Sequence, residues 1–376
     1  MTDATFQPLY PGPGRTALSD WWRSIDRTAL GWIAALLVAG VLLSFGSSPA
    51  ATDRMGIEND YYFVSRHAVF ALLAAGVLAA CSSLDPRGVR RLAGVLFAGA
   101  LVLMAYILVA GHEAKGAQRW IRVASFTFQP SELVKPALVV LVAWIFAERA
   151  RNPAMPGLKI AFLLWLVPVL LLLGQPDVGQ TALITMSLLA LFFFAGLPVM
   201  WIGGLFAVAL VGGVALYFLL PHMATRVNDF INTADGPAFQ VGKALDAISA
   251  GGVFGRGPGE GVVKYSLPDG HTDFIYAVAS EEFGLLAGLL LIVCFAAVVV
   301  RGLSSAAKLT DPFRQIAAAG LYTLFGFQAA INLAVNLHLV PPKGMTLPLI
   351  SYGGTSMLGT AVTLGLALAL TRRRGA

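Results

Sequence analysis

The sequence is poor in charged residues for its length. Only 12% of its 376 residues are Asp, Glu, Lys or Arg, while 57% are apolar. A soluble domain carries about 25% charged residues. The composition therefore excludes an ordinary soluble enzyme and predicts a polytopic membrane protein.

Cysteine is also scarce. Cys81 and Cys294 both fall in apolar segments without metal-ligand spacing, so we expect neither a disulfide framework nor a cysteine metal site. The net charge is +6, but Lys and Arg mostly flank apolar runs, which argues against a nucleic-acid partner. The first apolar run lacks a convincing cleavage site and is interpreted as a membrane anchor.

Long apolar runs are what the sequence has in abundance. An all-α polytopic membrane protein is predicted, with about ten transmembrane helices of about 20 residues each. A polar cytoplasmic segment (1–28) precedes the membrane domain (29–371), and a basic tail (372–376) follows it. A large outer loop, about 221–271, separates spans seven and eight. The predicted spans are 29–46, 61–81, 92–110, 131–148, 158–174, 179–196, 199–220, 272–300, 314–338 and 348–371.

The distribution of Lys and Arg predicts the orientation. With the N-terminus inside, fifteen of these residues fall in inner segments and six in the short outer loops. Positive charge accumulates on the cytoplasmic side of membrane proteins. Both termini are therefore predicted to be cytoplasmic.

This orientation gathers the polar motifs on the outer face. Spans four, six, eight and ten all start there, and each begins with polar residues. Those residues are Gln129, Ser131, Glu132 and Lys135; Asp177 and Gln180; His271, Thr272 and Asp273; and Ser351, Tyr352, Gly353 and Gly354.

Asp273 stands where the longest polar interval meets an apolar run. A carboxylate at this boundary serves either as a general base or as an interfacial charge that stabilises the first helical turn. His271 either orients Asp273, binds an anion or lies at headgroup level.

Two pairs of charged residues are candidates for substrate binding. Glu132 and Lys135 are spaced for an ion pair on one helix face, which is either self-contained or offers Lys135 to a phosphate or to Asp273. Arg119 and Lys343 are outer cations. Singly each suits an interfacial anchor, and together they suggest an anionic headgroup.

Several further residues are candidates with a structural alternative. Gly353 and Gly354 permit close approach of a ligand or of a neighbouring helix, and small residues in membranes favour packing. Secondary candidates are Gln129, Asp177, Gln240 and Lys264. The glycine-rich segment 251–261 lacks the Gly-Lys-Ser/Thr of a P-loop.

Two polar features lie within spans. Gln328, Asn332 and Asn336 form a stripe that either lines a cavity or joins helices. Glu281 and Glu282 lie about 12 Å further along span eight than Asp273, at a rise of about 1.5 Å per residue. Such midplane charges are typical of transporters.

The motifs together resemble the SEDS family (shape, elongation, division and sporulation proteins). The resemblance covers nearly the whole membrane region, and Lys343–Leu349 favours the cell-division branch. Asp269-Gly270 and Ser280 depart from the usual pattern without affecting Asp273. The five ordered motifs are Gly116–Ile121, Phe128–Lys135, Gln175–Gly179, His271–Ile275 and Pro348–Gly354.

The resemblance implies a peptidoglycan glycosyltransferase that polymerises lipid II at the outer face of the bacterial cytoplasmic (inner) membrane during septal cell-wall synthesis. The essential aspartate of the family falls on Asp273, and its conserved Glu and Lys fall on Glu132 and Lys135. The implied partners are lipid II, the nascent glycan strand, a class B penicillin-binding protein (the septal transpeptidase) and other division proteins, among membrane lipids. A divalent cation, Mg²⁺ or Mn²⁺, is a further candidate for offsetting pyrophosphate charge.

Two other functions compete with polymerisation. One is translocation of lipid II across the membrane, which would need charge or water access through the midplane. The other is a non-catalytic scaffold that recruits the transpeptidase. The outer clustering of motifs disfavours translocation.

Overall fold

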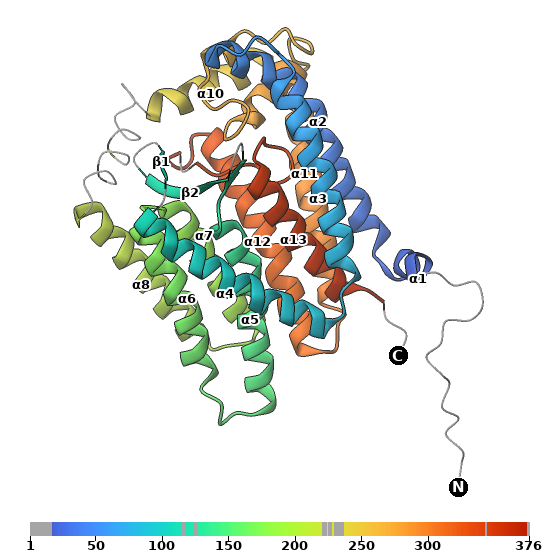
Figure 1. Ribbon diagram of the computed structural model, residues 1–376, viewed down its shortest axis with the longest axis vertical. Coiled ribbons are helices and arrows are strands. Elements are labelled where there is room, and N and C mark those ends of the chain that lie inside the picture. The colour runs from blue at the N-terminus through green and yellow to red at the C-terminus, as the bar shows by residue number, and fades with distance from the viewer. Residues whose placement is uncertain are drawn as a thin grey trace.

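The structure is a computed structural model that describes residues 17–110, 112–114, 117–123, 126–219, 224, 228, 237–342 and 344–373. It is almost entirely α-helical (Figure 1), which confirms the predicted fold class. Ten of the helices in the described part overlap the predicted spans. They are α2 (Arg27–Met55), α3 (Tyr62–Ser83), α4 (Pro86–Ala110), α5 (Ser131–Arg151), α6 (Gly157–Gly174), α7 (Val178–Phe194), α8 (Val199–Leu219), α11 (Ile275–Ala306), α12 (Pro312–Asn336) and α13 (Gly354–Thr371).

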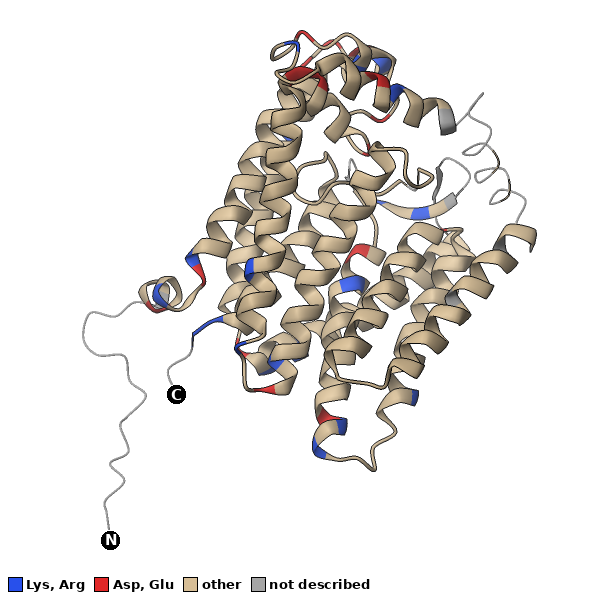
Figure 2. Ribbon diagram, turned by 180° about the vertical axis from the view of Figure 1, so that it is seen from behind, with Lys and Arg blue, Asp and Glu red and all other residues tan. Residues whose placement is uncertain are grey.

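Length and composition identify this chain as a multi-pass membrane protein. Seven helices in the described ranges are long and apolar enough to cross a membrane. Figure 2 shows charged residues gathered toward the two ends of the helix bundle, with few between them. Charges are confined in this way because burying them in hydrocarbon is costly.

The helices form two groups that meet along α12. Helices α2, α3, α11 and α13 lie on one side, and α4, α6, α7 and α8 on the other (Figure 1), with α5 packed against α4 and α12. Helix α13 packs closely on α3. A Cβ atom on Gly354 would come within 2.6 Å of the Phe70 ring, and one on Gly365 would come 2.6 Å from the Cβ of Cys81. Small residues here allow close helix packing, as expected in membranes.

Further elements lie in the loops. Helix α1 (Ala17–Ser24) precedes α2, and helix α10 (Pro237–Gly251) and the 3₁₀ turn η1 (Val263–Ser266) lie in the predicted outer loop. Between α4 and α5 the chain forms an antiparallel sheet of order β1-β2-β3, which the sequence reading did not predict. Its strands are β1 (His112–Ala114), β2 (Ala117–Val123) and β3 (Phe126–Phe128).

Helix α11 is broken at Gly284, where the backbone is non-helical with φ 80° and ψ 179°. The residues on either side fold back on each other. A Cβ atom on Gly288 would lie 2.8 Å from the Tyr276 hydroxyl and 3.0 Å from the Ser280 hydroxyl. In a straight helix, residues 276 and 288 would be about 18 Å apart along the axis. Residues 275–283 and 285–306 are therefore two helices joined by a sharp bend.

The outer loop satisfies the backbone groups that this break exposes. Arg256 and Gly257 donate their N–H groups to the carbonyls of Glu281 and Glu282, both at 3.0 Å. In return, Leu285 N–H donates to the Gly252 carbonyl at 2.9 Å. A break at membrane depth is tolerated only when the protein itself supplies such partners.

The bend corrects the sequence interpretation of span eight. The prediction of one uninterrupted span, 272–300, is wrong. Glu281 and Glu282 precede the bend, so the bend does not alter their predicted distance from Asp273. Residues 275–283 form a separate short helix, and the long segment begins after Gly284. Hydropathy did not reveal the bend because both parts are apolar.

Substitution of Gly284 tests this bend. Gly284→Ala should lower the free energy of unfolding by about 1–3 kcal/mol from backbone strain alone, and by more if the loop shifts. A Cβ atom there would also lie 2.6 Å from the Phe254 carbonyl carbon. Thermal unfolding of the purified protein measures the effect. The control is Gly94→Ala, because Gly94 lies in α4 with no atom within 4 Å of an added Cβ; equal stability of the two variants would contradict the prediction.

Candidate functional site

Asp273 lies in the turn that leads into α11 and is partly exposed. Two side-chain amides on α12 hold its backbone. Asn332 donates to the Asp273 carbonyl at 2.8 Å and Asn336 donates to it at 3.0 Å. The polar stripe on α12 therefore joins elements, one of the two roles left open by the sequence.

The carboxyl group of Asp273 lies near the segment that precedes α13. A Cβ atom on Gly344 would be 3.9 Å from Oδ2 of Asp273, and Gly344 has φ +63°. Asn332 also donates to the Met345 carbonyl at 2.6 Å, so one amide ties both segments together. Lys343, the cation predicted here, lies outside the described residues.

His271 and the Ser351–Gly354 motif meet beside Asp273. Tyr352 N–H donates to the His271 carbonyl at 2.9 Å. The His271 ring centroid is 4.6 Å from that of Phe63 and 5.8 Å from that of Tyr352. Burial raises the pKa of the Tyr352 hydroxyl, and its hydrogen bond with Arg66 opposes the shift.

The remaining residues of this motif shape the turn. The Ser351 hydroxyl accepts the Leu347 N–H at 2.8 Å. Gly353 is the N-cap residue of α13, and a Cβ atom on it would lie 3.2 Å from the Thr346 methyl group. With Gly354 packed on Phe70, the paired glycines serve helix packing in this structure.

The ion pair predicted between Glu132 and Lys135 is confirmed. The Lys135 Nζ lies 2.8 Å from Glu132 Oε2, and both side chains are buried. Gln180 donates to Glu132 at 2.8 Å, and Lys135 donates to Gln328 at 3.0 Å. Each charge therefore has a second partner inside the protein, as a buried pair requires.

A hydrogen-bonded path connects this pair with the neighbourhood of Asp273. Gln328 donates to the Ser356 hydroxyl at 3.4 Å, and Ser356 lies 2.6 Å from the Thr346 hydroxyl. Thr346 follows Met345, whose carbonyl shares Asn332 with Asp273. The pair and Asp273 thus belong to one polar network without direct contact between Lys135 and Asp273 being needed.

Asp177 and Gln129 are buried and form a second polar group with the partly exposed Arg119. Asp177 is the N-cap residue of α7 and accepts the Gln180 N–H at 3.2 Å. Gln129 donates to Asp177 at 3.3 Å, and Arg119 Nε lies 3.7 Å from its carboxylate. Burial raises the pKa of the Asp177 carboxyl, and the charge of Arg119 opposes that shift.

Arg119 also fastens the sheet to the turn before α7. From β2 it donates to the carbonyls of Gln175 and Pro176. These bonds use several of the guanidinium N–H donors, so Arg119 connects β2 to the turn before α7.

Lys264 is buried at the break in α11. Its Nζ pairs with Glu282 at 2.5 Å and donates to the Gly46 carbonyl of α2 at 3.0 Å. Glu281 accepts the N–H groups of Val262 and Val263, both at 2.7 Å, and that of Lys264 at 2.9 Å. The two glutamates hold the outer loop and are not charges within a straight span.

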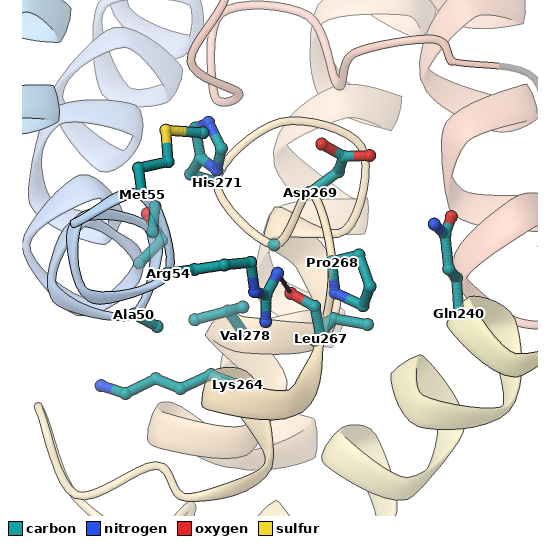
Figure 3. Close-up of a pocket in the computed structure, with 13 residues that line it drawn as sticks. Ala50, Arg54, Met55, Gln240, Lys264, Leu267, Pro268, Asp269, His271 and Val278 are labelled. Carbon is teal, nitrogen blue, oxygen red and sulfur yellow. Dashed lines mark hydrogen bonds between the residues drawn. The ribbon is translucent and has the colours of Figure 1, made fainter. Parts of the chain in front are cut away.

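A cavity of about 260 Å³ lies between this loop, α2 and α10. Figure 3 shows His271 and Asp269 on its wall, with Gln240 approaching from α10. Arg54 of α2, which sequence reasoning did not select, donates to the carbonyls of Leu267 and Tyr265, both at 2.7 Å. Its position in a predicted outer loop, where Lys and Arg are few, could have indicated Arg54 as a candidate.

The predicted divalent cation can be tested against the donor set. In the described ranges, no group of three or more His, Cys, Asp or Glu side chains could hold a metal ion. The described residues therefore do not form a site for a resident metal.

The comparisons with known proteins decide the family. Residues 27–375 match the family model of the FtsW, RodA and SpoVE cell cycle proteins. The chain belongs to this family. The predicted SEDS resemblance is confirmed.

Similar proteins span almost the whole chain. It is 54% identical to a probable peptidoglycan glycosyltransferase FtsW of Caulobacter vibrioides, over 96% of this chain and 92% of that protein. It is 36% identical to a protein of the same name from Geobacter sulfurreducens, over 93% of this chain and 96% of the relative.

Two solved structures are also similar. One is a chain from a peptidoglycan synthase complex that coordinates polymerisation and crosslinking, with TM-score 0.76, 29% identity and coverage of 93% of this chain and 98% of that chain. The other is the rod shape determining protein RodA of Thermus thermophilus, with TM-score 0.68, 28% identity and coverage of 93% and 97%.

Removal of Lys135 tests whether its role is structural. Lys135→Met should lower the free energy of unfolding by about 3–5 kcal/mol, because Glu132 would remain as a buried charge without its cation. The double variant Glu132→Gln, Lys135→Met should recover much of that loss. Chemical unfolding of the wild type and of both variants measures the two effects. A double variant as unstable as the single one would contradict this interpretation.

Proposed function

We propose that the chain is a peptidoglycan glycosyltransferase that polymerises lipid II at the outer face of the cytoplasmic membrane, with Asp273 as the general base. The observation that carries the proposal is the position of Asp273. Its backbone is held by Asn332 and Asn336, and its carboxyl group faces the segment at Gly344. The names of the relatives support the activity.

The chemistry needs one base and one displacement. In this mechanism Asp273 removes the proton from the 4-hydroxyl of the acceptor GlcNAc as that oxygen attacks the anomeric carbon of the donor MurNAc. The bond from that carbon to the pyrophosphate breaks, and the undecaprenyl pyrophosphate leaves. The configuration changes from α to β, as expected for a single displacement.

The leaving pyrophosphate requires positive charge or hydrogen-bond donors. Of the cations considered, Arg119 donates to main-chain carbonyls and Lys135 pairs with Glu132. We therefore assign these two to support of the site. Lys343 directly precedes Gly344 in the sequence and is our candidate for contact with the pyrophosphate.

His271 is assigned a supporting role. Its ring packs between Phe63 and Tyr352, and its carbonyl accepts the Tyr352 N–H. These contacts join the turn that carries Asp273 to the Ser351–Gly354 motif. We propose that His271 positions one wall of the substrate site.

A class B penicillin-binding protein, the septal transpeptidase, is the proposed partner. The similar chain from a synthase complex that coordinates polymerisation and crosslinking supports this assignment. We further propose that the protein acts at the division septum and that both of its termini lie in the cytoplasm.

The competing functions have less support. Translocation of lipid II relied on Glu281 and Glu282 as charges deep in a span, but both carboxylates bind the outer loop and Lys264. A scaffold role requires no carboxylate at Asp273. Full division function in a variant without polymerase activity would favour the scaffold.

Substitution of Asp273 tests the general-base role. Asp273→Asn should retain partner binding and thermal stability but lower the rate of polymerisation by about 10²–10⁴-fold, because a general base contributes about that much. Glycan strands formed from purified lipid II by the protein with its partner provide the measurement.

The matched control is Asp246→Asn on α10, where the carboxylate is exposed and pairs only with Lys243 among the described residues. It should leave the rate unchanged. Polymer at the wild-type rate from the Asp273 variant would refute the base, whereas loss of expression would favour a structural role.

Asn332→Ala tests the anchoring of Asp273. The variant should lower kcat by about tenfold or more, since small misplacements of a reacting group are costly. KM for lipid II should change little, because the amide contacts main-chain carbonyls of the protein. Asn332→Asp, which has the same shape but lacks the two N–H donors, should be as impaired; activity close to wild type in either variant would contradict the anchoring role.

A further inference from the structure

The inner end of the helix bundle contains a second, larger cavity of about 570 Å³. It lies where α1 meets α2, beside the inner ends of α11 and α13 and the start of α12. Its lining residues Arg301 and Ser305 lie at the C-terminal end of α11, whereas Asp273 precedes the N-terminal end of that helix, and α1 and α10 are well separated in Figure 1. The mechanism above does not use it.

Positive charge dominates its lining. Seven lysine or arginine residues face the cavity, against one carboxylate in the described lining, Asp26. The cationic residues are Arg23, Arg27, Arg301, Lys308, Arg314, Arg372 and Arg373.

The single carboxylate is already neutralised. Arg301 Nε donates to Asp26 at 2.8 Å and the Ser305 hydroxyl donates at 3.0 Å. Asp26 also caps α2 by accepting the Thr28 and Ala29 N–H groups. Burial acts to raise the pKa of Asp26, but the bonds from Arg301, Ala29 and Ser305 outweigh it and hold the pKa below its usual value.

Two further cations are fixed by main-chain carbonyls. Arg314 donates to the carbonyls of Leu370 and Arg372, both at 2.9 Å. Arg372 donates to the Ser24 hydroxyl at 2.9 Å and to the Ser83 carbonyl at 3.1 Å. These bonds set the positions of the guanidinium groups without cancelling their charge.

Three other cations have no such anchor. Arg23, Lys308 and Arg373 are exposed, and within the described part of the chain no hydrogen bond or ion pair engages their side chains. The cavity thus combines arginines fixed by hydrogen bonds with three exposed cations that can bind a ligand, and this charge favours an anionic ligand. Phosphate groups are the common anions that such clusters bind.

The adjoining helix indicates that the ligand comes from the membrane. Leu18 and Trp22 of α1 are 71% and 47% exposed, and Arg27 lies over the Trp22 ring at 5.2 Å. Trp21 donates to the Ser82 hydroxyl at 2.9 Å, which fastens α1 to α3. Exposed apolar and aromatic residues beside the ends of membrane helices are typical of a segment at the lipid interface.

We propose that this cavity binds the phosphate headgroup of an anionic phospholipid of the inner leaflet. The acyl chains would lie along the apolar faces of the helices beside Leu18 and Trp22. The shared chemistry is a phosphate group held by arginine and lysine, and a soluble phosphate compound is the competing source of that group.

The test uses the full-length chain in non-ionic detergent, titrated separately with phosphatidylglycerol and phosphatidylcholine. Native mass spectrometry counts the bound lipids. The wild-type protein should retain phosphatidylglycerol in preference to phosphatidylcholine, and added salt should weaken binding because the interaction is ionic. Equal retention of both lipids would overturn the proposal.

The decisive variant is Arg23→Gln, Lys308→Gln, Arg373→Gln. Its affinity for phosphatidylglycerol should fall on the order of tenfold to a hundredfold, given the usual contribution of each basic residue near anionic lipid. Its thermal stability should match that of the wild type because these side chains anchor nothing in the described structure. If it does not express, the single variant Lys308→Glu replaces it, with at least a tenfold loss expected.

The matched control removes the same charge elsewhere on the inner end. Arg87, Arg91 and Lys159 are exposed and do not line the cavity. Arg87→Gln, Arg91→Gln, Lys159→Gln should therefore retain the wild-type affinity. An equal loss in control and cavity variants would show general charge attraction and overturn the site.

Competition separates the two sources of phosphate. Glycerol phosphate and inorganic phosphate, each at millimolar concentration, should not displace the lipid. Displacement by either compound would assign the cavity to a soluble anion and overturn the lipid proposal.

Discussion

Two buried carboxylates, Glu281 and Glu282, determine how the segment between α10 and α11 is arranged. Together they accept three main-chain N–H groups of the outer loop and the ammonium group of Lys264. Charges in a nonpolar environment are tolerated only when fully paired, so these bonds hold the loop firmly against α11. The turn that carries Asp273 lies between the loop and the bend, and its position follows from both.

Much of the helical framework could be predicted because membrane burial demands long apolar runs. The pairing of Glu132 with Lys135 was also predictable, since their spacing brings them together on any helix. The partners of Asp177 and Lys264 were not, because they lie far apart in the sequence and only the packed helices unite them. The bend at Gly284 escaped prediction since a glycine within an apolar run is common in membrane helices.

The sequence predicted which candidate residues lie near one another better than it predicted the bonds between them. His271, Asp273 and Tyr352 do lie together: Tyr352 N–H donates to the His271 carbonyl, and the amides of Asn332 and Asn336 bind the Asp273 carbonyl. Arg119 and Lys135 were expected as substrate cations, but main-chain carbonyls and a buried carboxylate engage them. Sequence spacing does not reveal which of several nearby acceptors a long cationic side chain selects.

The anchoring of Asp273 acts on its main chain. The amides of Asn332 and Asn336 are neutral and bind the carbonyl oxygen, so this anchor is the same whether the carboxyl group is ionised or protonated. A residue that gains and loses a proton during turnover can keep its place by such means. Glu132 differs, because its carboxylate itself pairs with Lys135, so protonation would weaken the contact that holds it.

The bend at Gly284 determines which part of α11 runs along the helix bundle. The short helix 275–283 doubles back at Gly284, and its far end stays bound to the loop that precedes it. Residues 285–306 alone therefore run the length of the bundle. Lengthening or shortening the short helix would reshape the surface around Asp273 while leaving the direction of every later helix unchanged.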